Sequence, residues 1–262
     1  MFGKGYFNTA LLKLQGQEKN RIAKKSRDNI GNIMLKGHFD INDEECYASE
    51  DDPQLISNII GTKSLYVHNT LFTNQQFEFN LPSYFIFGFR GGAFSWLGPP
   101  EQGTIWENAD SFEINLSNDF TLSLWFNSMD GTSTIIGIGD INNNGMGFRL
   151  NNSKLEANFD GSVSVSSRPL LSGWNYIALT KKASSVKFYI NGSYVKGSSE
   201  NIGGEVSGTK KVYVGRSYNS SDEDSYSYAG GLTKVSSLYF YNEEVKNSDL
   251  RQNYWATKYR YK

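Results

Sequence analysis

The sequence predicts an all-β protein, a two-sheet antiparallel sandwich that ends in one short helix. From about residue 64 onward, the chain is a series of short runs in which apolar and polar residues alternate, which is the period of a β-strand. Clusters of Asn, Gly, Ser and Asp separate these runs, as turns separate strands. Aromatic residues make up 15% of the 262 residues, a composition that suits many short strands better than long helices.

The N-terminal residues have a different composition and predict an arm. A mostly basic stretch, GQEKNRIAKKSRDNIGN, precedes an acidic one, DINDEECYASEDDPQ, and neither has enough apolar residues to form a core. Two interpretations stay open: a flexible or loosely folded extension, or an arm that orders by docking on a partner. We therefore divide the chain into an N-terminal arm or anchoring segment, residues 1–78, and a sandwich, residues 79–262.

The strands of the sandwich follow in order after this boundary. SYFIFGF is expected to be an early strand, and NDFTLSLWFN has the clearest alternation. In the latter, Phe120, Leu122, Leu124 and Phe126 point one way while Thr121, Ser123 and Trp125 point the other, which is typical of a sheet with one face on a core. Further strands are expected at TIIGIG, MGFRLN, KLEANF, SVSVS, WNYIALT, VKFYI, SYVKG, KVYVGR and VSSLYFYN.

A tight hairpin is predicted at Asn191-Gly192, because this dipeptide favours two-residue turns in which both residues have positive φ. The turn pairs three residues before it with three after it: Ile190 with Ser193, Tyr189 with Tyr194, and Phe188 with Val195. Phe188 then faces the core, and the Tyr189/Tyr194 pair is the candidate for outward contact. We interpret Trp174, which opens the preceding strand, as a packing residue rather than a platform for a sugar.

The last segment, NSDLRQNYWATKY, predicts the helix. Ser248 or Asn247 can cap its first turn, and Leu250, Tyr254 and Trp255 supply an apolar stripe. We expect it to form a short lid at one end of the sandwich.

Several of these segments, taken together, resemble a known family. In order, the chain contains NDFTLSLWF, SGWNYIALT, VKFYINGSYV, VYVGR and YAGGLTKVSSLYFYNEEVKNSDLRQNY. This ordered set resembles the blocks of laminin-G-like domains in the concanavalin-A-like lectin and glucanase superfamily, over about residues 110 to 257. The resemblance implies a jelly-roll sandwich. Residues before 80 do not match the usual opening of the pattern.

The C-terminus is similar to a narrower group, the laminin-G-like proteins of tailed-phage virions. The residues that match their closing pattern are Gln252, Asn253, Tyr254, Ala256, Arg260 and Tyr261. The resemblance implies a bacteriophage virion component, such as a capsid decoration, head fibre or tail-associated protein. A bacterial or eukaryotic surface adhesin is the alternative.

Composition and motifs exclude several other classes. With 26 basic and 27 acidic residues, the chain has no basic excess for nucleic acid or an anionic membrane. The N-terminal residues contain no apolar core of signal-peptide length, and no later run approaches the length of a membrane span, so we expect neither element. The single cysteine, Cys46, allows no internal disulfide. We expect folding in the host cytoplasm and localisation in the virion.

We expect that the protein has no enzymatic activity. Glucanase relatives use an E-x-D-x-E strand, which this sequence lacks. The acidic clusters NDEEC and SDEDS lie in loop-like sequence, and His38 and His68 have no partners at metal-site or triad spacing.

One loop resembles the start of a calcium site. In GDINNNGMGFRLN, Asp140, Asn142 and Asn144 precede Gly145 with the D-x-N-x-N-G spacing. Asn151 stands where a calcium loop has its closing Glu, so the match is incomplete. The resemblance also implies calcium at one rim of the sandwich, with Asp140 as a ligand. The alternative is a hairpin loop that needs positive φ.

Two further segments are candidates for contact with partners. The loop SYNSSDEDSYSYAGG combines aromatic and acidic side chains that suit a glycan, namely Tyr218, Asp222, Asp224, Tyr226 and Tyr228. The alternative is a long polar hairpin. Phe94, Trp96 and Trp106 would form a subunit or partner interface if exposed, or pack the sandwich edge if covered.

From these observations we expect a non-enzymatic virion structural protein, anchored through its N-terminal region to other virion proteins. The alternative function is a carbohydrate-binding, lectin-like adhesin for host surface glycans, with calcium as the one cofactor considered. We expect no nucleic-acid or membrane partner, and the sequence leaves a homo-oligomer open.

Overall fold

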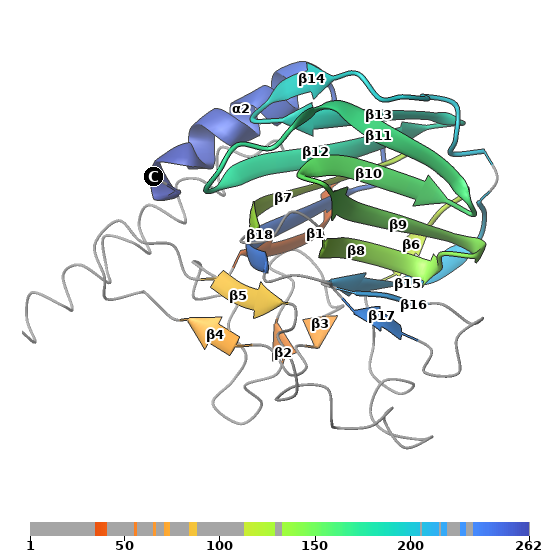
Figure 1. The fold of residues 1–262 in the computed structure, drawn as a ribbon, viewed down its shortest axis with the longest axis horizontal. Coiled ribbons are helices and arrows are strands. Elements are labelled where there is room, and N and C mark those ends of the chain that lie inside the picture. The colour runs from red at the N-terminus through yellow and green to blue at the C-terminus, as the bar shows by residue number, and fades with distance from the viewer. Residues whose placement is uncertain are drawn as a thin grey trace, which may run out of the picture.

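A computed structural model describes residues 113–128, 133–204, 206–214, 216–218, 226–228 and 233–261, and five strands upstream of them. The upstream strands are β1 (Leu35–Asp40), β2 (Leu55–Ile56), β3 (Leu65–Tyr66), β4 (Leu71–Thr73) and β5 (Tyr84–Phe87). The structure confirms the predicted class: in the part of the chain that it describes, strands dominate and a short helix follows them near the C-terminus (Figure 1).

The first sheet has the strand order β14-β13-β12-β7-β18-β5-β4, and β1 also pairs with β18. The bounds of its later strands are β7 (Phe120–Ser128), β12 (Asn175–Lys182), β13 (Ser185–Ile190), β14 (Ser193–Val195) and β18 (Thr233–Tyr241). Strand β1 belongs to the predicted arm, and it runs antiparallel to β18 from Leu35 opposite Tyr241 to Asp40 opposite Ser237. Part of the arm is therefore hydrogen-bonded to the sandwich.

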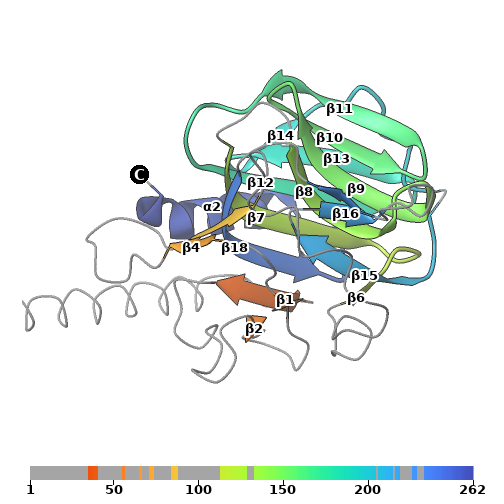
Figure 2. The same ribbon diagram turned by 60° about the horizontal axis from the view of Figure 1, so that its bottom comes forward.

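The second sheet has the order β11-β10-β9-β8-β15-β6. Its strands are β6 (Glu113–Asn115), β8 (Ser133–Asp140), β9 (Asn143–Asn151), β10 (Lys154–Phe159), β11 (Ser162–Pro169) and β15 (Thr209–Val214). Strand β16 (Arg216–Tyr218) lies beside β8, and β17 (Tyr226–Tyr228) pairs with β16. The two sheets form separate layers in both views (Figures 1 and 2).

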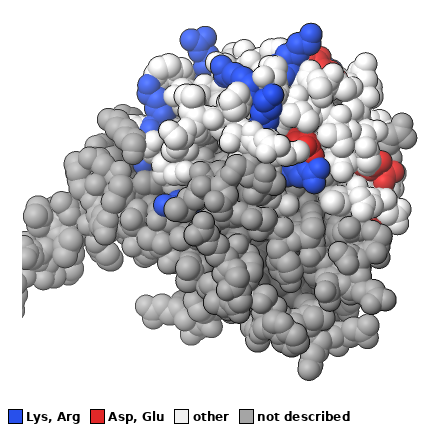
Figure 3. Space-filling view, viewed as in Figure 1, with Lys and Arg blue, Asp and Glu red and all other residues white. Residues whose placement is uncertain are grey.

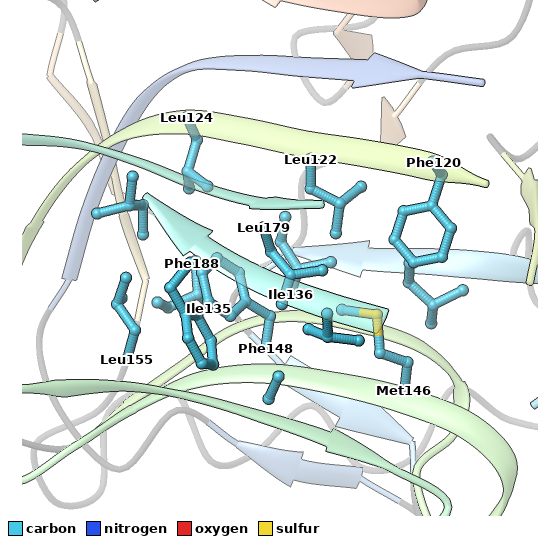
Figure 4. Close-up of a cluster of buried hydrophobic side chains, with 14 of the residues drawn as sticks. Phe120, Leu122, Leu124, Ile135, Ile136, Met146, Phe148, Leu155, Leu179 and Phe188 are labelled. Atoms are coloured by element: carbon cyan, nitrogen blue, oxygen red, sulfur yellow. The ribbon is translucent and has the colours of Figure 1, made fainter. Parts of the chain in front are cut away.

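The main hydrophobic core lies between the two sheets. Strand β7 contributes Phe120, Leu122, Leu124 and Phe126, the four residues predicted to share this face. Figure 4 shows the first three beside Leu179 and Phe188, and facing Ile136, Met146, Phe148 and Leu155 of the second sheet. All of these side chains are almost fully buried. Burial of this apolar surface is what holds the two layers together.

The opposite face of β7 is also buried, which the alternating pattern did not predict. Trp125 is 2% exposed, and Thr121 and Ser123 are fully buried. The Thr121 hydroxyl donates to the Glu243 carbonyl at 2.7 Å and accepts from the Val245 amide at 2.9 Å. Thr121 is therefore satisfied by the chain that follows β18, and Ser123 accepts a hydrogen bond from the Tyr176 hydroxyl of β12.

The C-terminal segment covers this outer face. Helix α2 (Asn247–Thr257) continues into a 3-10 turn, η2 (Lys258–Arg260). It belongs to a second core of buried residues: Trp125, Tyr176, Ala178, Tyr189, Tyr239, Tyr241, Val245, Leu250 and Tyr261. The helix is therefore a third layer on the first sheet, and the expectation that it merely closes one end was incomplete.

The predicted helix cap was wrong. The helix begins at Asn247 after Lys246, and no side chain caps its first turn. The Ser248 hydroxyl instead donates to the Asp249 carboxylate at 3.0 Å. Of the predicted apolar stripe, Leu250 is fully buried, but Trp255 is 52% exposed. No helix in the described part of the chain is long and apolar enough to span a membrane.

An ion-pair cluster next to this layer predicts a small dependence of stability on pH. The Lys187 ammonium donates to the Glu244 carboxylate at 2.7 Å, and Lys182 lies 3.2 Å from its other oxygen. The hydrogen bond from Lys187 lowers the pKa of the Glu244 carboxyl, and the same contact raises the pKa of Lys187. A carboxyl pKa that is lower in the folded state stabilises the fold at pH values above the pKa of that carboxyl in the unfolded state. A lysine pKa that is higher in the folded state stabilises the fold at pH values below the pKa of that lysine in the unfolded state.

We expect Glu244→Gln to lower the free energy of unfolding at neutral pH by less than about 1 kcal/mol, because the pair is near the surface. The difference from the parent should shrink as the pH falls through the lowered pKa of Glu244. Urea denaturation at neutral and acid pH measures this, with Glu243→Gln as the control. A difference that does not change with pH contradicts the assigned role of Glu244.

Candidate functional site

The first candidate site is the predicted calcium loop, at the end of β8. Asp140 is the last residue of β8 and pairs with Asn143, the first residue of β9, so Ile141 and Asn142 form a two-residue turn. Asp140 is 9% exposed, and its carboxylate accepts a hydrogen bond from the Asn142 amide at 3.0 Å. A side chain at Gly145 would lie 2.1 Å from the Asp140 carbonyl oxygen, which explains why glycine stands there.

Asn144 has a different role from the other two predicted ligands. It adopts φ 58°, as the alternative hairpin interpretation expected. Its amide N–H donates to the Asp160 carboxylate at 2.9 Å, and its side-chain oxygen accepts a hydrogen bond from the Ser207 amide. The Asn144 side chain therefore ties β9 to the segment before β15. Among the described residues, no three His, Cys, Asp or Glu side chains cluster as a metal site would require.

The calcium prediction has a direct thermal test. A site that includes Asp140 predicts that millimolar calcium raises the melting temperature relative to a chelator, since a ligand at about 100 times its Kd stabilises by about 2.7 kcal/mol. Asp140→Asn should remove the increase, and Asp160→Asn serves as a control on the neighbouring hairpin. Identical melting temperatures with calcium and with chelator would end the calcium hypothesis.

The predicted glycan loop is brought next to the predicted calcium loop. The backbone of Tyr218 pairs with Asp140 in parallel fashion, and on its other side Tyr218 pairs with Tyr226. Tyr228 pairs with Arg216 on the same hairpin. Asp222 and Asp224 lie outside the described residues, as do Phe94, Trp96 and Trp106. We call the turn 139–145 together with strands β16 and β17 the β8 rim.

The hairpin at Asn191-Gly192 has the predicted register, with Phe188 opposite Val195 and Tyr189 opposite Tyr194. Asn191 and Gly192 have φ of 53° and 73°. The prediction that Tyr189 faces outward was wrong. It is 4% exposed, because it packs in the second core on the outer face of the first sheet, which we call the outer core. Tyr194 is 44% exposed, and its hydroxyl donates to the Glu200 carboxylate.

A second site, which the sequence did not predict, lies where this hairpin meets the C-terminal segment. A cavity of about 260 Å³ is lined by Trp125, Trp174, Asn191, Tyr254, Lys258 and Tyr261. Trp125 lies on strand β7, Trp174 just before β12, and Asn191 in the β13–β14 turn. Tyr254 lies on the helix, Lys258 in the 3-10 turn, and Tyr261 directly after that turn. We call this cavity the aromatic pocket. Its lining is scattered over the chain, so no local motif could have indicated it.

The aromatic pocket is held rigidly by stacking and hydrogen bonds. The Trp125 and Tyr261 rings stack with centroids 4.1 Å apart, and Trp174 lies 5.2 Å from Tyr261. The Trp125 indole N–H donates to the Thr257 hydroxyl at 2.8 Å. Asn191 accepts a hydrogen bond from the Tyr176 amide at 2.9 Å. Trp174 is thus a packing residue, as predicted, but it is only partly buried and also forms a wall of the pocket.

Buried tyrosines beneath the pocket remain neutral. Burial raises the pKa of Tyr176 to about 12 and that of Tyr241 well above its ordinary value. The Tyr176 hydroxyl donates to Ser123 at 2.8 Å, and the Tyr241 hydroxyl accepts from the Asn253 amide at 2.9 Å. These groups connect the sheet to the C-terminal segment and supply no charge to the site.

Comparison with known proteins identifies the family. The sequence model of the laminin G family, described as the concanavalin A-like lectin/glucanases superfamily, matches residues 102–248, more than half of the chain. No curated protein matches the sequence. Among solved structures, Trypanosoma rangeli sialidase in complex with 2,3-difluorosialic acid matches with a TM-score of 0.53 and 14% identity, over 90% of this chain and 38% of the sialidase.

A mutant of the same sialidase that displays trans-sialidase activity matches with a TM-score of 0.56 and 14% identity, over 94% of this chain and 39% of that one. The chain thus spans about two fifths of these proteins, and at such low identity the similarity establishes the fold alone. Because the family match covers more than half of the chain, including strands β6 to β18, the chain belongs to the laminin G family of the concanavalin A-like lectin/glucanases superfamily.

Proposed function

We propose that this protein is a non-enzymatic structural component of a bacteriophage virion. It displays the lectin-like sandwich as a capsid decoration, head fibre or tail-associated module, and it is attached to other virion proteins through its N-terminal region. The observation that carries this proposal is the C-terminal pattern from Gln252 to Tyr261, which is similar to the closing segment of laminin-G-like virion proteins.

The positions of these residues support a structural role for the pattern. Tyr261 stacks on Trp125, and its hydroxyl lies within hydrogen-bond distance of Ser237 and Ser236, at 2.6 and 2.9 Å. Asn253 and Arg260 are 2% and 7% exposed. A segment that seals the outer core in this way makes the sandwich a self-contained module, as display on a particle requires.

The contacts of the buried Glu156 carboxylate support the proposal that the protein is not an enzyme. Retaining glycoside hydrolysis needs two carboxyl groups about 5 Å apart, one of which must be able to give up a proton. Glu156 is 2% exposed, but Arg149 forms an ion pair with it, and the Asn151 amide donates to it at 2.7 Å. It is thereby held in a structural network, with both oxygens engaged.

The N-terminal region supplies the proposed attachment. Its basic stretch at 16–32 and acidic stretch at 40–54 offer opposite charges that can set the register on a partner. Strand β1 lies beside these stretches in sequence and is fixed to β18, so a docked arm would be coupled directly to the sandwich. The same region can carry contacts between copies in a homo-oligomer.

Co-sedimentation tests the proposal. The purified full-length chain is mixed with particles of the virus that encodes it, prepared from a mutant in which this gene is deleted. We expect the chain to sediment with the particles at a fixed stoichiometry, and a variant with Lys24, Lys25 and Arg27 changed to Gln to bind less. A chain that stays in the supernatant as a soluble monomer contradicts the proposal.

A second candidate function is carbohydrate binding at the β8 rim. The observation that favours it is the pairing of Tyr218 with both Asp140 and Tyr226, which gathers aromatic and acidic positions at one sheet edge. A glycan array run with and without calcium tests it. Loss of signal in Tyr218→Ala supports this site, and a silent array under both conditions counts against it.

A further inference from the structure

The two sides of the sandwich differ in how its sheets end. On one side, strands β11 and β14 are tied to each other: Ser166 forms an isolated bridge with Gly197, and the Ser198 amide donates to the Val165 carbonyl at 2.9 Å. On the other side, the described parts of the sheets end in β1 and β4 and in β6 and β17, and no described pairing ties these two groups together. Edge strands are templates for pairing with another chain, so this second side is the one open to a partner.

Strand β1 is the longest of these open edges. It has six residues, whereas β4, β6 and β17 have three each. Among the described strands it pairs with β18 alone, from Leu35 opposite Tyr241 to Asp40 opposite Ser237. Figure 2 shows it outside β18, at the margin of the first sheet. The second edge of β1 therefore presents backbone N–H and C=O groups with which a further strand can pair.

The charges on either side of β1 determine which strand fits this edge. The basic stretch 16–32, before β1, has five basic and two acidic residues, and the acidic stretch 40–54, after it, has seven acidic residues and no basic one. Six residues of extended strand span about 20 Å, so the two stretches leave β1 at well-separated ends. An antiparallel neighbour of the same sequence places each stretch beside its opposite charge, whereas a parallel neighbour places like charges together.

The face of the sandwich drawn in Figure 3 offers no comparable match for the basic stretch. Its described acidic side chains are few and lie apart from one another, while Lys and Arg side chains are spread over its upper part. Elsewhere, the Glu244 carboxylate is already engaged by Lys182 and Lys187, at 3.2 and 2.7 Å, and Glu156 by Arg149. The acidic stretch of a second copy is therefore the electrostatic complement of the basic stretch.

We propose that two copies of this chain associate through their β1 strands, in an antiparallel pair related by two-fold symmetry. The first sheets of the two copies then form one continuous sheet, and the basic stretch of each copy lies against the acidic stretch of the other. Both copies use the same surface, so the contact closes at two copies and does not propagate into a fibre. The inference specifies the contact between copies and does not rest on the virion role.

The charges of β1 itself select the register of this pair. In an antiparallel pair, residues directly opposite each other either both hydrogen-bond across the pair or both point their N–H and C=O groups away. Two identical strands therefore pair symmetrically about one residue, which lies opposite its own copy. With His38 at this centre, Lys36 of each copy lies level with Asp40 of the other, since each is two residues from the centre. Opposite charges at such positions stabilise a strand pair.

Light scattering coupled to size-exclusion chromatography tests the proposal on the full-length chain. We expect a particle of twice the 29.5 kDa of one chain, and an affinity between copies that falls as salt is added. Lys36→Glu should raise the dissociation constant about tenfold or more, because like charges then replace opposite charges at both symmetry-related positions. The double variant Lys36→Glu/Asp40→Lys should restore the affinity. Lys246→Glu, the same change at an exposed lysine before the helix, is the matched control and should bind like the parent.

Cysteine cross-linking tests the register. In a Cys46→Ser background, His38→Cys should form a disulfide between two copies in a glutathione buffer. Directly opposite residues have Cα atoms about 4.5–5.5 Å apart, which is within the range of a disulfide. Glu113→Cys, on the edge strand β6, is the matched control and should stay reduced. Because cross-linking requires no change of charge, it keeps the test valid if a charge variant fails to fold.

The proposal is overturned by a chain that is monomeric throughout the micromolar range, or by a dimer whose dissociation constant Lys36→Glu leaves unchanged. A folded double variant that stays as weak as Lys36→Glu also overturns it, as does a cross-link that forms with Glu113→Cys and not with His38→Cys. A monomeric chain that still sediments with particles overturns this inference alone. A dimeric chain that stays in the supernatant contradicts the virion role alone, so the two proposals fail independently.

Discussion

Replacement of Trp125 by alanine is expected to lower the free energy of unfolding by about 3–5 kcal/mol, the range for removal of a large buried aromatic side chain. Trp125 is 2% exposed and lies at the centre of the outer core, 4.1 Å from the Tyr261 ring and 5.7 Å from the Tyr176 ring. Its indole N–H also holds Thr257, the last residue of the helix. The substitution therefore removes both the packing and the polar anchor of the C-terminal segment.

Urea denaturation followed by circular dichroism measures the loss of stability, and hydrogen exchange over residues 246–261 measures release of the segment. The control is Trp255→Ala, the same substitution at a residue that is 52% exposed, which should change stability by about 0.5 kcal/mol or less. Equal effects at the two tryptophans would show that the outer face of the first sheet is not a core.

Gly192→Ala is expected to destabilise the fold by about 1–3 kcal/mol more than Gly161→Ala, the usual cost of forcing extra volume into a packed site. Each glycine is the second residue of a two-residue hairpin turn, with φ of 73° at Gly192 and 86° at Gly161. Both alanines adopt the same strained backbone. A Cβ at Gly192 would lie 2.8 Å from the Arg251 Cα, whereas a Cβ at Gly161 has nothing within 4 Å.

The difference between these variants therefore isolates the contact between the hairpin and the helix. Denaturation curves of both proteins, recorded side by side, give the two free energies. The aromatic pocket should also be disturbed in Gly192→Ala, because Tyr254 lies 3.3 Å from the added carbon. If the two variants lose the same stability, the helix does not pack on the turn as described.

The sequence was most informative where structure is decided locally. The register at Asn191-Gly192 followed from the dihedral angles of one dipeptide, and the core face of β7 followed from a period of two residues. The helix forms in the segment where it was predicted, because the residues that favour it follow one another in the sequence. Its cap was mispredicted, since the Ser248 hydroxyl binds the Asp249 carboxylate instead of a backbone amide.

Features that depend on distant segments could not be predicted. Whether Trp125 and Tyr189 face water or a core depends on where the last residues of the chain pack, and a strand pattern carries no information about that. The approach of Tyr218 to Asp140 likewise joins segments nearly eighty residues apart in sequence. The aromatic pocket is the extreme case, because six residues from separate elements form it.

Two kinds of observation support the proposed function. The sandwich and its family are established by the strands and by the match to residues 102–248. The assignment to a virion rests on the C-terminal pattern, whose residues seal the outer core by stacking on Trp125 and bonding to Tyr241.

Fractionation of native particles tests the virion role most directly. A lysate of cells in which the gene is expressed from its own genome is separated on a density gradient, and each fraction is analysed by mass spectrometry for this chain and for DNA. We predict that the chain bands with DNA-containing particles at a constant ratio to the other virion proteins. A chain found in the soluble fractions alone, with particles devoid of it, would contradict the proposed function.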